Sequence, residues 1–291
     1  MDLLFEPLGS PIIVRALLAS TMVGVVCAVV GTYVVLRGIA FIGDAIAHAG
    51  FPGVVVAYMV GIPFYIGAAI AAVGTALAIG FVTKRAGIRQ DTAIGVLFAG
   101  TFALGVFLFS AIQGYVADLF SFLFGNVLAI GTPDLIALLV LGTGVILTVA
   151  VLWKELLYAT FDPLGAAASG INVDRLEYLF LALVALTIVV SLQAVGIILV
   201  VAMLVTPAAT AQLLTVRFVR LMVVAALIGI TSSVIGLYAS YWLDVASGAT
   251  IVLVQTLMFM VVLVVGPRGA LARRRARGTG GPVERSVDAT A

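Results

Sequence analysis

The chain has 291 residues, of which 64% are hydrophobic and only 10% are charged, and its formal net charge of +2 by itself favours no class of partner. Soluble domains carry about 25% charged residues and disordered chains are poor in apolar residues, so the composition excludes both classes. Because one membrane crossing takes about 20 residues, the length allows about eight to ten spans and no large soluble catalytic domain.

Nine apolar stretches follow one another along the chain, and each is long enough to cross a membrane as a helix. Two of them meet within an uncharged run from Leu179 to Val216, where we expect a tight turn near Gly196. If one of the first two stretches does not fully span, the number falls to eight. The predicted spans are residues 12–36, 40–60, 62–83, 92–112, 133–153, 178–196, 197–215, 221–243 and 248–266.

The basic residues predict how these spans are oriented. If successive spans alternate in direction, every lysine and arginine except Arg15 falls on one side of the membrane. Positive residues collect on the cytoplasmic side, so we predict a cytoplasmic C-terminus and an outer N-terminus. Residues 1–266 then form one transmembrane domain. Residues 267–291 are a basic, glycine-rich tail that we expect to be disordered and to contact the lipid bilayer rather than a nucleic acid.

Two connections between spans are longer than turns. The outer one, residues 113–133, contains the apolar segment LFSFLFGNVLAI, which is too short to span and suggests a re-entrant or interfacial helix. In the inner one, residues 154–175, Asp162 and Pro163 fit the N-cap and first position of a short helix, and Gly170 fits its C-terminal stop. This weakly polar helix, with charged flanks that include Glu155, is either a docking knob for a soluble partner or a surface helix on lipid.

The second stretch opens with AFIGDAIAHAGFPG, in which the single histidine of the chain, His48, follows Asp44 by four residues. On a helix the two side chains share one face, and ionisable residues inside a span indicate function because they are costly there. A carboxylate oxygen and an imidazole nitrogen can both bind a divalent first-row metal, and a second copy of the chain would supply two more ligands. The pair also fits a structural hydrogen bond or a proton relay, and Asp44 alone fits a solvated cap.

The seventh stretch, GIILVVAMLVTPAATAQLL, carries polar groups in an otherwise apolar run. Thr206 and Thr210 are four residues apart on one face, Pro207 interrupts the helix between them, and Gln193 precedes the stretch. This face could line a cation pathway, with the backbone carbonyl freed near Pro207 as a contact. Alternatively, the threonine hydroxyls satisfy the interrupted helix.

The chain carries no ATP-binding motif of the P-loop type. Its two lysines, Lys84 and Lys154, lie outside any G-x-x-x-x-G-K-[ST] pattern. ATP-driven transport would therefore need another chain to hydrolyse the ATP. We expect a transport subunit without enzymatic activity of its own and without a permanently bound cofactor.

Three segments together resemble the membrane permease of the ABC transporters for manganese, zinc or iron. They are VVLRGIAFIGDAIAHAGFPGV, ELLYATFDPLGAAASGI and SLQAVGIILVVAMLVTPAATA, and the resemblance covers most of residues 10–266. It implies an all-α polytopic fold of the type II permeases, which the vitamin B12 importers share. It also implies that Asp44 and His48 bind the metal in the translocation path. The loop around Phe161, Asp162 and Pro163 would be the coupling helix seated on the ATPase.

The same resemblance implies partners, cargo and location. The expected assembly is a homodimer with cytoplasmic ATP-binding subunits and an extracytoplasmic metal-binding protein, in the cell membrane of a prokaryote. The transported ion is then Mn²⁺, Zn²⁺ or Fe²⁺, and we favour Mn²⁺.

Two other classes of protein fit parts of the sequence. A proton- or sodium-coupled secondary carrier would also use an intramembrane aspartate and histidine, although we find no inverted repeat of the kind such carriers often show. An intramembrane enzyme with His48 as base would need a nucleophile or a bound metal, and neither Ser110 nor Ser191 has a supporting motif.

Overall fold

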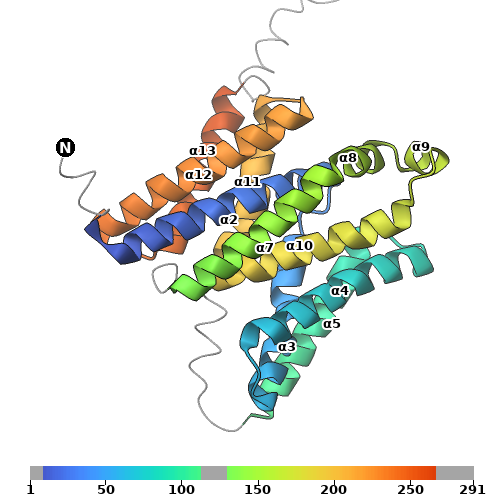
Figure 1. The fold of residues 1–291 in the computed structure, drawn as a ribbon, viewed down its shortest axis with the longest axis horizontal. Coiled ribbons are helices and arrows are strands. Elements are labelled where there is room, and N and C mark those ends of the chain that lie inside the picture. The colour runs from blue at the N-terminus through green and yellow to red at the C-terminus, as the bar shows by residue number, and fades with distance from the viewer. Residues whose placement is uncertain (1–8, 113–129, 267–291) are drawn as a thin grey trace, which may run out of the picture.

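The computed structural model describes residues 9–112 and 130–266, which contain helices and no strand (Figure 1). Within these ranges nine helices are long and apolar enough to cross a membrane, which confirms the predicted all-α polytopic fold. They are α2 (Pro11–Leu36), α3 (Ile42–Val60), α4 (Phe64–Ala86), α5 (Gln90–Ser110), α7 (Thr132–Val151), α10 (Val173–Val195), α11 (Ile197–Leu214), α12 (Phe218–Leu243) and α13 (Ser247–Val265).

The helix bounds follow the predicted spans closely, with one larger difference at α10. This helix begins at Val173 because the Asn172 side chain accepts a hydrogen bond from the Arg175 backbone N–H at 3.0 Å and caps its first turn. The capped turn is polar, so hydropathy alone does not reveal it. The turn at Gly196 is confirmed, since this residue has a φ of 80° between α10 and α11. The predicted re-entrant segment lies almost wholly in residues 113–129, outside the described residues, as does the basic tail.

The long helices form two groups joined by α10. In one group α3 packs against α4 and α5, and in the other α2 packs against α11 and α12, with α13 outside them. Helix α10 contacts α4, α2 and α7 and so lies between the groups (Figure 1). Two short helices, α8 (Trp153–Phe161) and α9 (Pro163–Ala168), lie together at one end of the molecule (Figure 1). The sequence pattern predicts α9 but not α8.

Burial separates the helices that carry the site from those that face outward. In the most apolar windows of α3 and α10, 67% of the residues are buried within the chain, against 17% for α5 and α13. Lipid tails solvate apolar side chains as well as other apolar side chains do, so the exposed faces of α5 and α13 are stable in a bilayer. The helix that carries Asp44 and His48 is thus an interior helix of the chain.

Two glycines bring the backbones of α3 and α4 into contact. A Cβ atom added to Gly53 would overlap the carbonyl oxygen of Gly67, and one added to Gly67 would overlap that of Gly53. We therefore expect Gly53→Ala to destabilise the protein by about 1–3 kcal/mol, because the two helices must separate to admit the methyl group. The thermal unfolding midpoint of the detergent-purified protein measures this effect.

Gly74→Ala on α4 is the matched control for this substitution. A Cβ atom at Gly74 meets nothing within 4 Å, so the same change in chemistry adds no overlap there. We expect an unfolding midpoint at or slightly above that of the wild type, because alanine favours a helix over glycine. Equal midpoints for the Gly53 and Gly74 variants would contradict the close contact between α3 and α4.

Candidate functional site

Asp44 and His48 lie in the first turns of α3, on one narrow strip that the described part of the chain leaves partly exposed. Their side chains are 34% and 28% exposed, whereas the residues between them, Ala45, Ile46 and Ala47, are buried. An ionisable pair that faces lipid is costly. The strip therefore suits a water-filled path or a second protein surface better than lipid.

The hydrogen bonds of His48 fix which ring nitrogen is available for a ligand. Its Nδ1 atom lies 3.0 Å from the backbone carbonyl oxygen of Asp44 and 3.4 Å from the carboxylate Oδ1 of the same residue. A carbonyl oxygen can only accept, so Nδ1 donates and carries the proton of the neutral ring. The lone pair is then on Nε2, and neutral imidazole is the form that binds metal ions.

Two phenylalanines of α5 surround the imidazole ring. The ring centroids of Phe98 and Phe102 each lie 5.6 Å from that of His48, at interplanar angles of 86° and 76°. Edge-to-face contacts of this kind are favourable and restrict the orientation of the ring. Neither phenylalanine is predicted from the sequence as part of the site. The spacing of four residues places Phe98 and Phe102 on one face of α5, but it does not indicate which helix this face contacts.

The pair by itself does not complete the coordination of a metal ion. Among residues 9–112 and 130–266, no three or more His, Cys, Asp or Glu side chains are grouped so that they could hold one. No lysine or arginine in those ranges forms an ion pair with Asp44. The carboxylate is thus available to a cation, and completion of the shell by a second copy stays a prediction.

The polar groups of the seventh span are placed mainly inside the chain. Pro207 and Thr210 are buried and Thr206 is half-buried. The Thr210 hydroxyl donates to the backbone carbonyl of Thr206 at 2.7 Å. This bond agrees with the alternative in which the threonine hydroxyls satisfy the helix that Pro207 interrupts. Gln193 lies in the last turn of α10, and its side chain is outside the described part of the structure. A pathway role for these four residues stays a prediction.

The inner loop folds as its sequence predicts. The Asp162 carboxylate accepts a hydrogen bond from the Gly165 backbone N–H at 2.8 Å and caps α9, with Pro163 as its first residue. Gly170 follows the end of α9 with a φ of 87°. These caps hold α9 as a short exposed helix.

Apolar side chains cover the tip of this loop. Leu164 on α9 is 83% exposed and Phe161 at the end of α8 is 65% exposed. Exposed apolar side chains of this kind are typical of a surface that binds another protein or lipid. Glu155, in the first turn of α8, has a buried Oε2 atom that accepts no hydrogen bond within the described residues. The loop therefore exposes an apolar tip, while the Glu155 acceptor that is unpaired among the described residues lies buried.

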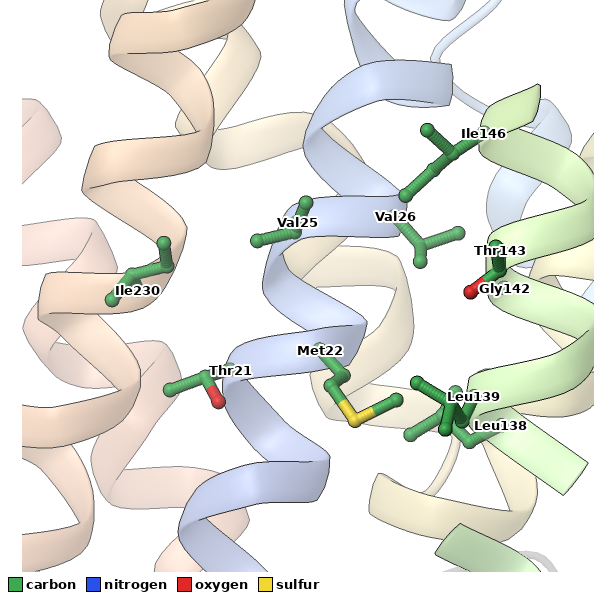
Figure 2. Close-up of a pocket in the computed structure, with 10 residues that line it drawn as sticks. All are labelled: Thr21, Met22, Val25, Val26, Leu138, Leu139, Gly142, Thr143, Ile146 and Ile230. Carbon is green, nitrogen blue, oxygen red and sulfur yellow. The ribbon is translucent and has the colours of Figure 1, made fainter. Parts of the chain in front are cut away.

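A separate cavity of about 480 Å³ lies between α2, α7 and α12 (Figure 2). Among the described residues that line it, two threonines are the only polar side chains, and there is no carboxylate or imidazole. No residue of α3 lines it, so it does not belong to the site of Asp44 and His48. The lining residues are Thr21, Met22, Val25, Val26, Leu138, Leu139, Gly142, Thr143, Ile146 and Ile230.

Known proteins resemble this chain over almost its whole length. The profile of the ABC 3 transport family matches residues 10–266. The manganese transport system membrane protein MntC of Halalkalibacterium halodurans is 47% identical over 91% of this chain and 90% of its own length. The chelated iron transport system membrane protein YfeD of Yersinia pestis is 40% identical over 90% of this chain and 88% of its own.

A solved structure agrees with these sequence relatives. PsaBC from Streptococcus pneumoniae, determined in complex with a Fab, superposes with a TM-score of 0.82 at 35% sequence identity. The alignment covers 94% of this chain and 98% of that one. The likeness therefore extends over the whole helical bundle.

Proposed function

The chain belongs to the ABC 3 transport family and is the membrane permease of an ABC transporter, and we propose that its cargo is a divalent metal ion, with Mn²⁺ favoured over Fe²⁺ and Zn²⁺. The nine membrane helices found in the described part of the chain have the type II permease fold, which confirms the fold expected from the sequence. Relatives named for manganese and for iron transport support the class of cargo.

The observation that carries the proposal is the partly exposed strip of α3. Asp44 offers carboxylate oxygens, and His48 offers Nε2 because its Nδ1 is bonded to a backbone carbonyl. Carboxylate and imidazole together suit Mn²⁺, Fe²⁺ and Zn²⁺. A second copy of the chain would bring an equivalent pair to the same metal ion, so that the homodimer encloses one site.

Transport then follows from this site and from the inner loop. A metal ion released by an extracytoplasmic binding protein enters between the two copies and pauses at Asp44 and His48. The inner loop, with Phe161 of α8 and Leu164 of α9 exposed at its tip, sits through α9 on a cytoplasmic ATP-binding subunit, which hydrolyses the ATP. Movement of this subunit opens the path inward. The C-terminus lies on the same cytoplasmic side, and Gln193, Thr206, Pro207 and Thr210 contribute to the path.

The alternative of a proton- or sodium-coupled carrier receives no support from the family or the relatives. It would use the same pair of side chains, so the energy source distinguishes the two functions rather than the binding site. The decisive comparison is between ATP and an ion gradient.

Reconstitution of the chain with its ATP-binding subunit in liposomes tests the proposal. We expect manganese to cross the membrane only when both the subunit and ATP are present, because the chain lacks a P-loop. Liposomes that contain the chain alone, with a proton or sodium gradient imposed, are the control. Manganese uptake in those control liposomes would contradict the proposal and favour a secondary carrier.

A further inference from the structure

Arg37, the residue that follows α2, contacts two other helices at the end of the molecule that carries α8 and α9. Its Nε atom donates a hydrogen bond to the Thr160 hydroxyl at 3.1 Å, and its guanidinium carbon lies 4.1 Å from the centre of the Phe180 ring. Thr160 belongs to the last turn of α8, just before Asp162, and Phe180 belongs to α10. One side chain thus joins the end of α2 to the inner loop and to α10.

The surroundings of the Arg37 guanidinium strengthen its contacts with Thr160 and Phe180 and restrict its movement. Burial lowers the pKa of Arg37 from its ordinary value, and the nearby charge of Glu177 opposes that change. Hydrogen bonds to a charged group that is largely removed from water are stronger than those at a surface. The planar guanidinium, held by a hydroxyl and an aromatic face, also loses less freedom than a lysine would.

The backbone after Arg37 passes directly into the helix of the candidate metal site. Residues 38–41 alone separate Arg37 from α3, and they are held by hydrogen bonds. The Ile39 N–H donates to the Val34 carbonyl at 3.2 Å, and the Ile42 N–H donates to the Ile39 carbonyl at 2.9 Å. A shift at the end of α2 therefore reaches the first turn of α3, where Asp44 lies, without a slack loop to absorb it.

We propose that Arg37 is a positioning residue that transmits movement of α8 and α9 to the metal site on α3 through its hydrogen bond to Thr160. The inference rests on the proposed function, in which α9 sits on the ATP-binding subunit. Movement of α9 displaces Thr160, and Arg37 carries that displacement into the turn that leads to Asp44. Loss of the hydrogen bond uncouples α8 and α9 from the candidate metal site on α3, while both parts keep their own structure.

Manganese transported per ATP hydrolysed, measured with the complete complex in liposomes, tests this link. Thr160→Val removes the hydroxyl at nearly constant shape, and we expect the ratio to fall about tenfold. ATP hydrolysis and manganese binding should stay near the wild-type values, because the exposed side chains at the loop tip and the residues of the candidate metal site are unchanged. Thr160→Ser keeps the hydroxyl and should restore the ratio, which a merely structural contribution of the methyl group would not predict.

Thr83→Val is the matched control. The hydroxyls of Thr160 and Thr83 both donate to a carbonyl of their own helix, at 2.6 Å and 2.8 Å, but of these two hydroxyls, within the described residues, only that of Thr160 also accepts a hydrogen bond from Arg37. We expect the Thr83 variant to transport as the wild type does. An equal loss in both variants would overturn the inference, because the effect would then come from the own-helix bond.

Two further outcomes separate this inference from the proposed function. A Thr160→Val complex with the wild-type ratio overturns the link through Arg37 and leaves the proposed function intact. A wild-type complex that hydrolyses ATP without moving manganese overturns the proposed function itself. If the Thr160→Val chain does not assemble, Arg37→Lys, which keeps the charge and loses the Nε donor, is measured in its place, with the same loss expected.

Discussion

Cells that carry Asp44→Asn or His48→Ala in place of the wild-type chain are expected to take up manganese no faster than cells without the chain. At the proposed site His48→Ala removes the imidazole and Asp44→Asn replaces the charged carboxylate with a neutral amide. The loss should exceed the about 10- to 100-fold that removal of an outer-shell partner costs. The initial rate of radioactive manganese uptake, normalised to the amount of chain in the membrane, measures the effect.

The Asp44→Asn variant also separates metal binding from a purely structural pairing. The Nδ1 atom of His48 bonds the backbone carbonyl of Asp44, which the substitution leaves in place. A pair that only stabilised α3 would therefore keep most of its structure in this variant, whereas a metal site loses its negative charge. Wild-type uptake by both variants would rule out the site.

Asp91→Asn is the matched control for the aspartate. This residue lies in the first turn of α5 and pairs with Arg89 at 3.7 Å, with both side chains more than half exposed. Exposed ion pairs contribute little to stability, about 0–1 kcal/mol. We expect uptake close to that of the wild type, so that a loss at Asp44 reflects its position and not the loss of an acidic group as such.

Leu164→Glu is expected to prevent the permease from binding its ATP-binding subunit. The wild-type side chain is 83% exposed at the tip of the inner loop, so the substitution leaves the folded chain undisturbed. In the assembled transporter the glutamate would be buried without a partner, which costs several kcal/mol and lowers the affinity at least about a hundredfold. Co-purification of the ATP-binding subunit with the tagged permease measures the loss.

Val216→Glu provides the comparison for this variant. Val216 is 70% exposed in the short connection between α11 and α12, which the predicted topology places on the same side of the membrane. It gains the same charge at an apolar exposed position outside α8 and α9, and we expect normal co-purification. Retention of the subunit by the Leu164 variant would show that α9 is not the docking element.

The spans and the caps of the short helix could be predicted from the sequence because local physics determines them. Length and hydropathy are sufficient to predict a helix in lipid, because the backbone N–H and C=O groups of the segment must form their hydrogen bonds with one another. Asp162, Pro163 and Gly170 each act within one turn of their own position. In such cases the chemistry of neighbouring residues is enough.

The remaining features depend on which helices meet, and the sequence pattern does not encode that. Phe98 and Phe102 reach His48 only because α5 packs against α3, and Arg37 reaches Thr160 only because the end of α2 lies beside α8. In a chain that is apolar almost everywhere, periodicity does not distinguish a face that meets another helix from a face that meets lipid. The polar start of α10 escaped prediction for the opposite reason, because the hydropathy pattern marks only the apolar part of a helix.

The contact between Gly53 and Gly67 limits how a transport cycle can proceed. Helices whose backbones touch cannot slide past each other without first separating, so α3 and α4 have to rotate or tilt as one body. Lys84, near the end of α4, forms ion pairs with Asp174 at 2.8 Å and Glu177 at 3.2 Å on α10. These ion pairs attach one end of α4 to α10. A metal ion bound on α3 would then move together with both helices. The path for the ion would have to open at the edges of this pair of helices and not between α3 and α4.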